Sequence, residues 1–244
     1  MVKMRLFLLI ILCAVSLVSF GQDYEKDSFE TTAGKLDITF IGHGSLMFEI
    51  DNKVIHIDPS SREGDYTKLP KADLILITHH HGDHCDATAV DQIKKLDTKV
   101  ITTQLAIDKL GFGQLLSNDE KTLFEGITIE ALPAYNLVHK RENGEFFHPK
   151  GTCNSYLLTI GGKRIFIGGD TENTPEMKAL KNIDIAFLPM NLPYTMTPEM
   201  VADAAKAFRP KILYPYHYGN TDTGIIVDLM KGEAGIETRI RKME

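Results

Sequence analysis

The stretch that decides the fold is Thr-His-His-His-Gly-Asp-His at residues 78–84. It directly follows Leu-Ile-Leu-Ile at 74–77, a short continuous apolar run that is typical of a strand buried on both faces. Four of the nine histidines of the chain lie in this stretch, beside a carboxylate. Because imidazole and carboxylate are the ligands that zinc and similar metals prefer, the end of this strand predicts a metal site.

The spacing within the stretch indicates which side chains point toward the same site. His79 and His81 stand two residues apart, so they point the same way in extended backbone. Gly82 permits the sharp bend that brings Asp83 and His84 back toward them. The intervening histidine at position 80 points away and is not expected to be a ligand.

Around this stretch the sequence is rich in strand patterns. Apolar and alternating runs predict strands at residues 36–41, 45–50, 53–57, 99–102, 127–131, 155–160, 163–167, 183–188, 211–214 and 236–240. The pairs at 51–52 and 161–162, Asp-Asn and Gly-Gly, are typical of hairpin turns. Helices are expected after Asp86, after Thr197 and near 225–230. Strands outnumber helices, which favours one domain of packed sheets with helices outside.

The N-terminus has the pattern of a targeting segment. Lys3 and Arg5 precede an uncharged apolar run at 6–18, and small residues at 19 and 21 permit cleavage before Gln22. The run is short beside the roughly 20 residues of a membrane span. We therefore expect residues 1–21 to be a signal peptide and the mature protein to be exported, periplasmic or secreted, with no stable membrane span.

The composition of the chain limits its partners. Its 244 residues include 27 Lys and Arg and 33 Asp and Glu, which gives a formal net charge of -6. An acidic chain without a basic run argues against nucleic-acid binding, so the expected partner is a small-molecule substrate. A homo-oligomer stays open. Residues 22–35 are polar and are expected to form an N-terminal tail before a domain at 36–244.

Two cysteines remain once the signal peptide is removed, Cys85 and Cys153. An exported compartment permits a disulfide, but the sequence leaves open whether these two pair. Cys85 lies beside the histidines without a CxxC partner, so we interpret it as a small buried thiol rather than a ligand.

Taken together, the motifs resemble those of the metallo-β-lactamase-fold hydrolases. Four further segments match in order and spacing: Ile41-Gly42-His43-Gly44-Ser45, Ile57-Asp58-Pro59, Gly168-Gly169-Asp170-Thr171 and Pro215-Tyr216-His217-Tyr218-Gly219. The chain looks most like the short single-domain branch that includes the ascorbate-6-phosphate lactonases. The resemblance implies an α+β fold, a four-layer αβ/βα sandwich of two mixed β-sheets with outer helices, with the site at one edge between the sheets.

The resemblance also implies two divalent metal ions, zinc first, with manganese or iron as alternatives. The implied ligands are His79, His81 and a third histidine for one metal, and Asp83, His84 and His217 for the other. Asp170 would bridge both metals through its two oxygens, and Asp58 would orient the histidine loop.

The third histidine is where this sequence departs from the family pattern. Many relatives carry it soon after the strand at 127–131, where this chain has Asn136, a poor zinc ligand. His139 lies in a polar stretch that is typical of an exposed loop, whereas His148 comes just before the strand leading to Asp170. The order favours His148 as the ligand and leaves His139 as the alternative.

The function implied by the resemblance is an exported dinuclear metal-dependent hydrolase that uses metal-bound hydroxide on a lactone or ester, with Asp83 as the catalytic residue that orients the nucleophile or carries its proton. A phosphodiesterase of the same fold and a non-catalytic metal-binding protein are the alternatives. His43, between two glycines, has either a substrate-contacting or a structural role. Lys150 and Tyr194 are expected to be a solvated lysine and a packed tyrosine.

Overall fold

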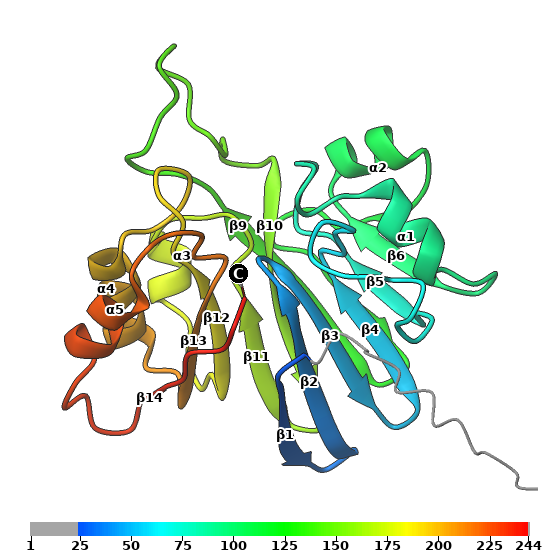
Figure 1. The fold of residues 1–244 in the computed structure, drawn as a ribbon, viewed down its shortest axis with the longest axis horizontal. Helices are drawn as coiled ribbons and strands as arrows, with labels where there is room; N and C mark the ends of the chain where they lie inside the picture. The colour runs from blue at the N-terminus through cyan, green and yellow to red at the C-terminus, as the bar shows by residue number, and fades with distance from the viewer. Residues whose placement is uncertain (1–23, 244) are drawn as a thin grey trace, which may run out of the picture.

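The computed structural model describes residues 24–243, so the predicted signal peptide at 1–21 lies outside the described residues. Two seven-stranded sheets pack across a shared core (Figure 1). The first sheet runs in the order β1 (Lys26–Thr31), β2 (Gly34–Gly42), β3 (Ser45–Ile50), β4 (Lys53–Ile57), β5 (Leu74–Leu76), β6 (Lys99–Thr102) and β7 (Gln114–Leu115). The second runs in the order β14 (Glu237–Thr238), β13 (Ile212–Tyr216), β12 (Ile185–Pro189), β11 (Lys163–Ile167), β10 (Cys153–Ile160), β9 (Ile127–Ala134) and β8 (Lys121–Phe124).

Helices cover the outer faces of both sheets. The first sheet carries α1 (Ala87–Ile93) and α2 (Gln104–Leu110), and the second carries α3 (Pro175–Lys178), α4 (Pro198–Phe208) and α5 (Thr223–Leu229). Each sheet is mixed, since antiparallel pairs give way to parallel ones at β4 and at β11. The predicted α+β fold, a four-layer αβ/βα sandwich, is therefore confirmed.

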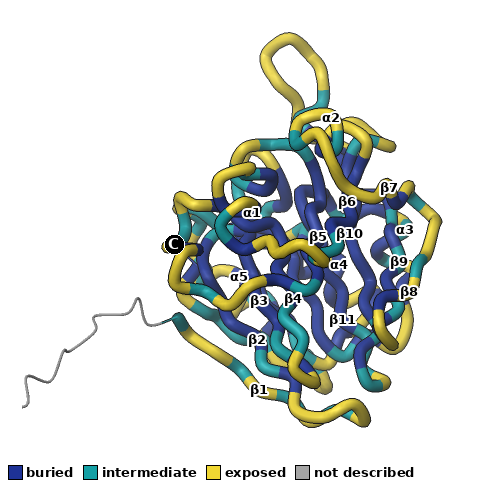
Figure 2. The backbone as a smooth tube through the Cα atoms, turned by 90° about the vertical axis from the view of Figure 1, so that its right-hand side faces the viewer, coloured by how far each residue is buried: buried dark blue, intermediate teal, exposed yellow. Residues whose placement is uncertain are grey.

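The core between the sheets is aromatic at its centre. Phe40 of β2 lies 5.1 Å from Tyr214 of β13, measured between ring centroids. Tyr214 in turn stacks on Phe187 of β12, again at 5.1 Å. Figure 2 shows the central strands largely buried and many connecting turns exposed. Burial of this apolar surface is the main term that holds the two sheets together.

The hairpins and helix starts read from the sequence are confirmed. Asp51 and Asn52 have φ of 47° and 59°, the left-handed values that a tight two-residue turn between β3 and β4 requires. Gly161 and Gly162 turn β10 into β11 in the same region of φ. At the helix starts, Asp86 and Thr197 accept hydrogen bonds from the backbone of Thr88 and Met200, respectively.

The prediction of an N-terminal tail at 22–35 is wrong for the described part of that segment. Residues 26–31 form β1, which pairs antiparallel with β2 along its whole length. The sequence does not mark this strand by apolar alternation, because it is a polar edge strand with only Phe29 packed against the core. It is held from the other end of the chain, because the Asp27 carboxylate accepts two hydrogen bonds from Arg241 Nη2, at 2.7 and 2.8 Å.

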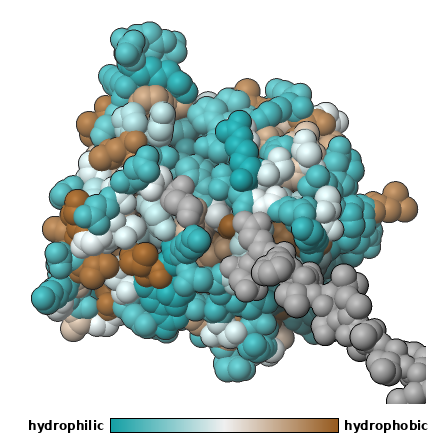
Figure 3. Space-filling view, in the orientation of Figure 1, coloured by the Kyte–Doolittle hydropathy of each residue, from teal (hydrophilic) through white to brown (hydrophobic). Residues whose placement is uncertain are grey.

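Four short elements were not predicted, namely β7, β8, α2 and α3. The helix after Asp86 ends at Ile93. Leu96, an apolar residue three positions later, therefore lies outside the helix and is fully exposed. Within residues 24–243, no helix has the length and apolar character to cross a membrane. Figure 3 shows a face on which hydrophilic residues predominate and apolar ones form small separate patches.

The parallel strand pairs of the two sheets determine where the candidate site lies. The pairs from β4 to β7 and from β11 to β14 are parallel, so their carboxyl ends lie at one edge of each sheet. The loops after β5, β11, β12 and β13 therefore meet at one edge of the sandwich. The loop that joins β9 to β10 projects beside this edge, at the top of Figure 1.

Candidate metal centre

The loop after β5 is anchored by a buried carboxylate. Asp58 follows β4, and its Oδ1 accepts the Thr78 backbone N–H at 2.7 Å. Its Oδ2 accepts the Thr78 hydroxyl at 2.7 Å and lies 2.8 Å from Nδ1 of His84. Because an ionised carboxylate only accepts hydrogen bonds, His84 Nδ1 is the donor. Asp58 thus orients the histidine loop, as the resemblance implies.

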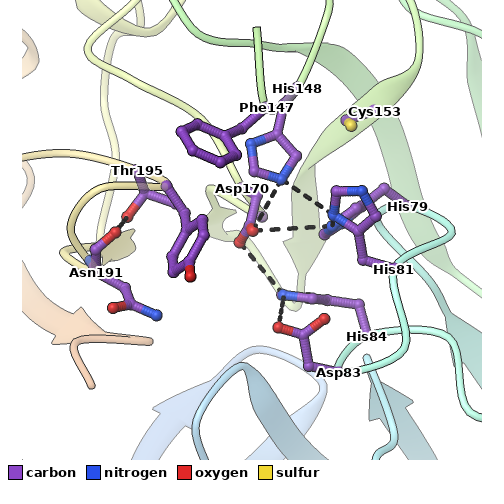
Figure 4. A network of polar contacts seen from close by, with 12 residues as sticks. His79, His81, Asp83, His84, Phe147, His148, Cys153, Asp170, Asn191 and Thr195 are labelled. Carbon is purple, nitrogen blue, oxygen red and sulfur yellow. Dashed lines mark hydrogen bonds and ion pairs between the residues drawn. The ribbon is translucent and has the colours of Figure 1, made fainter. Parts of the chain in front are cut away.

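The first ligand group consists of three histidines and one oxygen of Asp170 (Figure 4). His79 Nε2 lies 3.0 Å from His81 Nδ1, and His148 Nε2 lies 3.2 Å from the same atom. Asp170 Oδ2 lies 3.1 Å from His148 Nε2 and 3.8 Å from His79 Nε2.

The second ligand group uses the other oxygen of Asp170. The Nε2 atoms of His84 and His217 lie 3.0 Å apart, and each is 3.3 Å from Asp170 Oδ1. Asp83 Oδ2 lies 3.8 Å from both nitrogens. The two groups therefore share Asp170, which contributes one oxygen to each.

The glycines around these ligands permit close approach of the backbone. Gly169, with φ +60°, precedes Asp170, and a Cβ there would lie 2.9 Å from the Asn154 carbonyl oxygen. A Cβ at Gly44 would lie 2.8 Å from the imidazole of His84. A larger residue at Gly44 would therefore displace His84, and one at Gly169 would press on Asn154 and Thr78 beside the site.

The donor set fits divalent metals. His84 Nδ1 lies 2.8 Å from Asp58 Oδ2 and His148 Nδ1 lies 3.0 Å from Asn136 Oδ1, so each ring turns its Nε2 toward Asp170. The buried Asp170 Oδ1 has no hydrogen-bond partner. Imidazole nitrogens thus converge on a buried carboxylate oxygen that has no hydrogen-bond partner, an arrangement that fits a divalent cation. Tetrahedral zinc, with bonds of about 2.0–2.2 Å, places its ligand atoms about 3.3–3.6 Å apart, close to the separations here.

Burial and charge set the protonation of the ligands. Burial lowers the pKa of His79 well below its usual range and that of His81 to about 4, so both rings are neutral at pH 7. Burial opposes a charge on His84, but Asp170 and Asp58 raise its pKa well above the usual range. A metal would therefore displace a proton from His84, and metal affinity should fall at low pH.

The structure brings His148, and not His139, into the first group. His148 is buried beside Asp170, whereas His139 Nδ1 lies 2.7 Å from Glu172 Oε1, outside both groups. His80 also lies outside both groups, and its backbone carbonyl accepts a hydrogen bond from Lys109.

His43 lies at the second group. Its ring centroid is 3.8 Å from that of His217, and its Nε2 is 3.5 Å from Asp83 Oδ2. The backbone is in the left-handed region, with φ of 50°, and the His43 N–H donates to the carbonyl of Met243. Burial opposes a charge on Asp83, but the neighbouring imidazoles of His217 and His43 hold its pKa well below the usual range.

The two described cysteines are free and buried. Burial raises the pKa of Cys85 to about 11 and that of Cys153 to about 12, so both are inert thiols at neutral pH. Cys85 packs in the outer core beneath α1, as expected from its sequence context.

A cavity of about 390 Å³ opens onto the ligands. Its floor is formed by His81, Asp83, His148, Asp170 and His217. The facing wall is formed by Arg141, Phe147, Asn191 and Tyr194. The rings of Phe147 and Tyr194 meet edge to face at 5.1 Å, and the Arg141 guanidinium lies 4.9 Å over the Phe147 ring.

Most of this wall could not be found from the sequence. Arg141, Phe147 and Asn191 belong to loops without periodicity, and Tyr194, expected to be packed, instead lines the cavity and is 45% exposed. Lys150 pairs with Glu176 at 2.7 Å and does not line the cavity.

Comparisons with known proteins identify the family to which the chain belongs. A family profile described as a beta-lactamase superfamily domain matches residues 37–217. A UPF0173 metal-dependent hydrolase of Thermococcus onnurineus is 32% identical over 205 residues, which are 78% of this chain and 88% of the relative. A relative of the same name from Bacillus velezensis is 34% identical over 197 residues, which are 75% and 85% of the two chains.

Solved structures give the same result. The crystal structure of a protein described as a metal-dependent hydrolase, from Parabacteroides distasonis, is 50% identical with a TM-score of 0.87, and the match covers 91% of this chain and 100% of that one. A metallo hydrolase from Ignicoccus hospitalis, at 22% identity and a TM-score of 0.68, shares the fold. The chain therefore belongs to the beta-lactamase superfamily and, within it, to the UPF0173 family of metal-dependent hydrolases.

Proposed function

We propose that this protein is an exported hydrolase with two metals that opens a lactone or ester-type bond in a small molecule. The observation that carries the proposal is the sharing of Asp170, which offers one oxygen to each of two groups of imidazole nitrogens. Divalent metals bound in such groups supply water of lowered pKa and polarise a substrate oxygen.

Asp83 has the exposure and charge that a nucleophile-orienting residue needs. Its side chain lines the cavity and is 33% exposed, so it can reach a water molecule there. Its lowered pKa keeps it ionised at neutral pH and makes it a weak base. We therefore assign it to accepting a hydrogen bond from the attacking water and orienting it, with proton acceptance as a later step.

The cavity wall favours a small substrate with a flat or apolar part and a negative charge. Phe147 and Tyr194 offer ring surface, and Asn191 an amide. Arg141 is the one lysine or arginine among the described residues that line the cavity, and it forms no ion pair within residues 24–243. A guanidinium in this position can bind a carboxylate or phosphate group of the substrate.

The leaving group also limits the substrate. Two carboxyl groups, Asp83 and Asp170, are among the described residues that line the cavity. The pKa of each is lowered. Neither is a strong general acid at neutral pH, so a bond whose leaving group departs without protonation is favoured. Lactones and activated esters meet that condition, and the likeness of the motifs to sugar-lactone hydrolases also supports a carbonyl centre.

The test is a panel of three substrates under metal control. A γ-lactone, p-nitrophenyl acetate and bis(p-nitrophenyl) phosphate are offered to chelated protein and to the same protein after zinc or manganese is restored. We expect hydrolysis of the first two, lost with chelator and regained with metal. Faster cleavage of the phosphodiester would favour the phosphodiesterase instead. Two bound metals without turnover of any compound would favour the non-catalytic protein.

Export is tested separately. Expression of the full chain in a bacterial host with a secretion system should yield a mature N-terminus at Gln22, read by N-terminal sequencing. A soluble product that still begins at Met1 would refute export without affecting the metal chemistry.

A further inference from the structure

His148 reaches the first ligand group from a loop that is closed at its base by Asn136. Asn136 Oδ1 accepts the His148 backbone N–H at 2.7 Å and lies 3.0 Å from His148 Nδ1. The Asn136 N–H in turn donates to the His148 carbonyl at 2.9 Å. These contacts bring residues 136 and 148 together and leave 137–147 as a projecting loop.

The role of Asn136 follows from its chemistry. An amide oxygen is a poor zinc ligand, but it is a good acceptor for an imidazole N–H. By accepting from Nδ1 it fixes the tautomer of His148 and turns the Nε2 lone pair toward Asp170, 3.1 Å away. Asn136 thus orients a ligand supplied from farther along the chain rather than acting as a ligand itself.

Glu172 fixes the start of the projecting loop, at residues 136–139. It lies two residues after Asp170 and is fully buried. Its oxygens accept the backbone N–H groups of residues 137, 138 and 139, at 2.6, 2.7 and 2.8 Å. They also accept Asn136 Nδ2 at 3.1 Å and bind His139 Nδ1 at 2.7 Å. Within residues 24–243 no lysine or arginine pairs with Glu172, so this one segment satisfies the buried charge.

The same contacts place the substrate wall. Asn136 Nδ2 also donates to the Tyr194 carbonyl at 2.8 Å, which joins the two loops that form the wall. The projecting loop carries Arg141 and Phe147 into the cavity. A displacement of Asn136 would therefore move a metal ligand and the wall together.

We propose that Asn136 and Glu172 are positioning residues that join the first metal site and the substrate wall into one unit, with Asn136 acting on the metal through His148. This inference rests on the proposed two-metal function. Its consequence is selective: loss of the connection should weaken one metal and spare the second group, which Asp58 holds independently.

The test is a cobalt(II) titration of chelated protein, followed by visible absorbance, which reports each coordination site without any substrate. We expect two equivalents to bind the parent. In Asn136→Ala and Glu172→Gln, one equivalent should bind about 10- to 100-fold more weakly and the other as before. Asn143→Ala, in the same loop, is the matched control and should bind both normally, since the Asn143 side chain bonds to Glu145 away from the ligands.

A double-mutant cycle separates positioning from a merely structural role. In a His148→Ala background, Asn136→Ala should cause no further loss of cobalt affinity, because the ligand through which it acts is gone. A further loss of the same size, or parental binding in both Asn136→Ala and Glu172→Gln, would overturn the inference.

Failure of the proposed two-metal function would give a different result in the cobalt titration. A parent that binds a single equivalent would refute the dinuclear proposal, and the connection would then be judged by whether Asn136→Ala weakens that equivalent. Trypsin cleavage at Lys140 and Arg141 gives a second measurement. Glu172→Gln should be cut faster than Asn143→Ala at equal stability, and equal rates would count against the role of Glu172.

Discussion

The two ligand groups share Asp170 but differ in what holds them. In the second group, His217 directly follows β13, Asp58 fixes His84 in the loop after β5, and the His43 ring packs on His217. In the first group, His148 comes from the base of a long loop and depends on Asn136 and Glu172. The comparison teaches that the second group, the strand-held half, depends on a strand end and a buried carboxylate, whereas the first group, the loop-held half, depends on a ligand from a projecting loop.

The largest expected effect is at the residue that the two groups share. Asp170→Ala should lower the bound metal from two equivalents to below one and reduce hydrolysis by about 100-fold or more, because both groups lose an anionic ligand. Elemental analysis and initial rates check this, with Asp91→Ala on the surface of α1 as the control. A parental rate in Asp170→Ala would refute metal-dependent hydrolysis.

Next in size is the loss of a ligand from the loop-held half. His148→Ala should remove most of one metal equivalent, whereas His139→Ala should leave both, since His139 contacts Glu172 and neither ligand group. Metal content after gentle purification measures the difference. The reverse order would reassign the third histidine.

The corresponding change in the strand-held half is Asp58→Ala. It leaves the Thr78 N–H and His84 Nδ1 without their acceptor, which should lower the free energy of unfolding by roughly 1–3 kcal/mol for each buried donor. Metal affinity of one equivalent should fall about 10- to 100-fold. Urea unfolding and cobalt titration check both effects. An unchanged unfolding midpoint would contradict the anchoring role given to Asp58.

The smallest expected effect is in the substrate wall of the loop-held half. Arg141→Ala should raise KM about tenfold for a lactone or ester with a carboxylate or phosphate group, through loss of a charge-assisted contact of roughly 1.4 kcal/mol, and leave a neutral ester unchanged. Lys140→Ala is the matched control, since its ammonium lies over the Phe146 ring and its residue does not line the cavity. An equal rise in KM for charged and neutral substrates would show that Arg141 does not bind a negative group of the substrate.

Features with a local physical cause could be predicted from the sequence. The buried strand before His79, the turn at Asp51–Asn52 and the Thr197 cap each follow from a few adjacent residues. The ligand cluster at residues 79–84 is of the same kind, because strand geometry and a glycine bend bring it together.

Features that depend on distant polar contacts could not be predicted. β1 is a polar edge strand, so no apolar alternation marks it. Glu172 looks like any acid in a loop, and only the folded chain brings five donors of residues 136–139 onto it. The position of His43 was open for the same reason, since its partners Asp83 and His217 come from two separate loops.

The joining of the two ends of the described chain has a consequence for the order of folding. Asp27 binds Arg241 across 214 positions of sequence, and the His43 N–H donates to Met243. Contacts of such separation carry a large loop-closure entropy and form late. During synthesis residues 241–243 emerge after the rest of the described residues, so the sheets can collapse before they arrive, but until then the contact between His43 and Met243 cannot form. Completion of the metal centre is therefore expected to be among the last steps by which this chain matures.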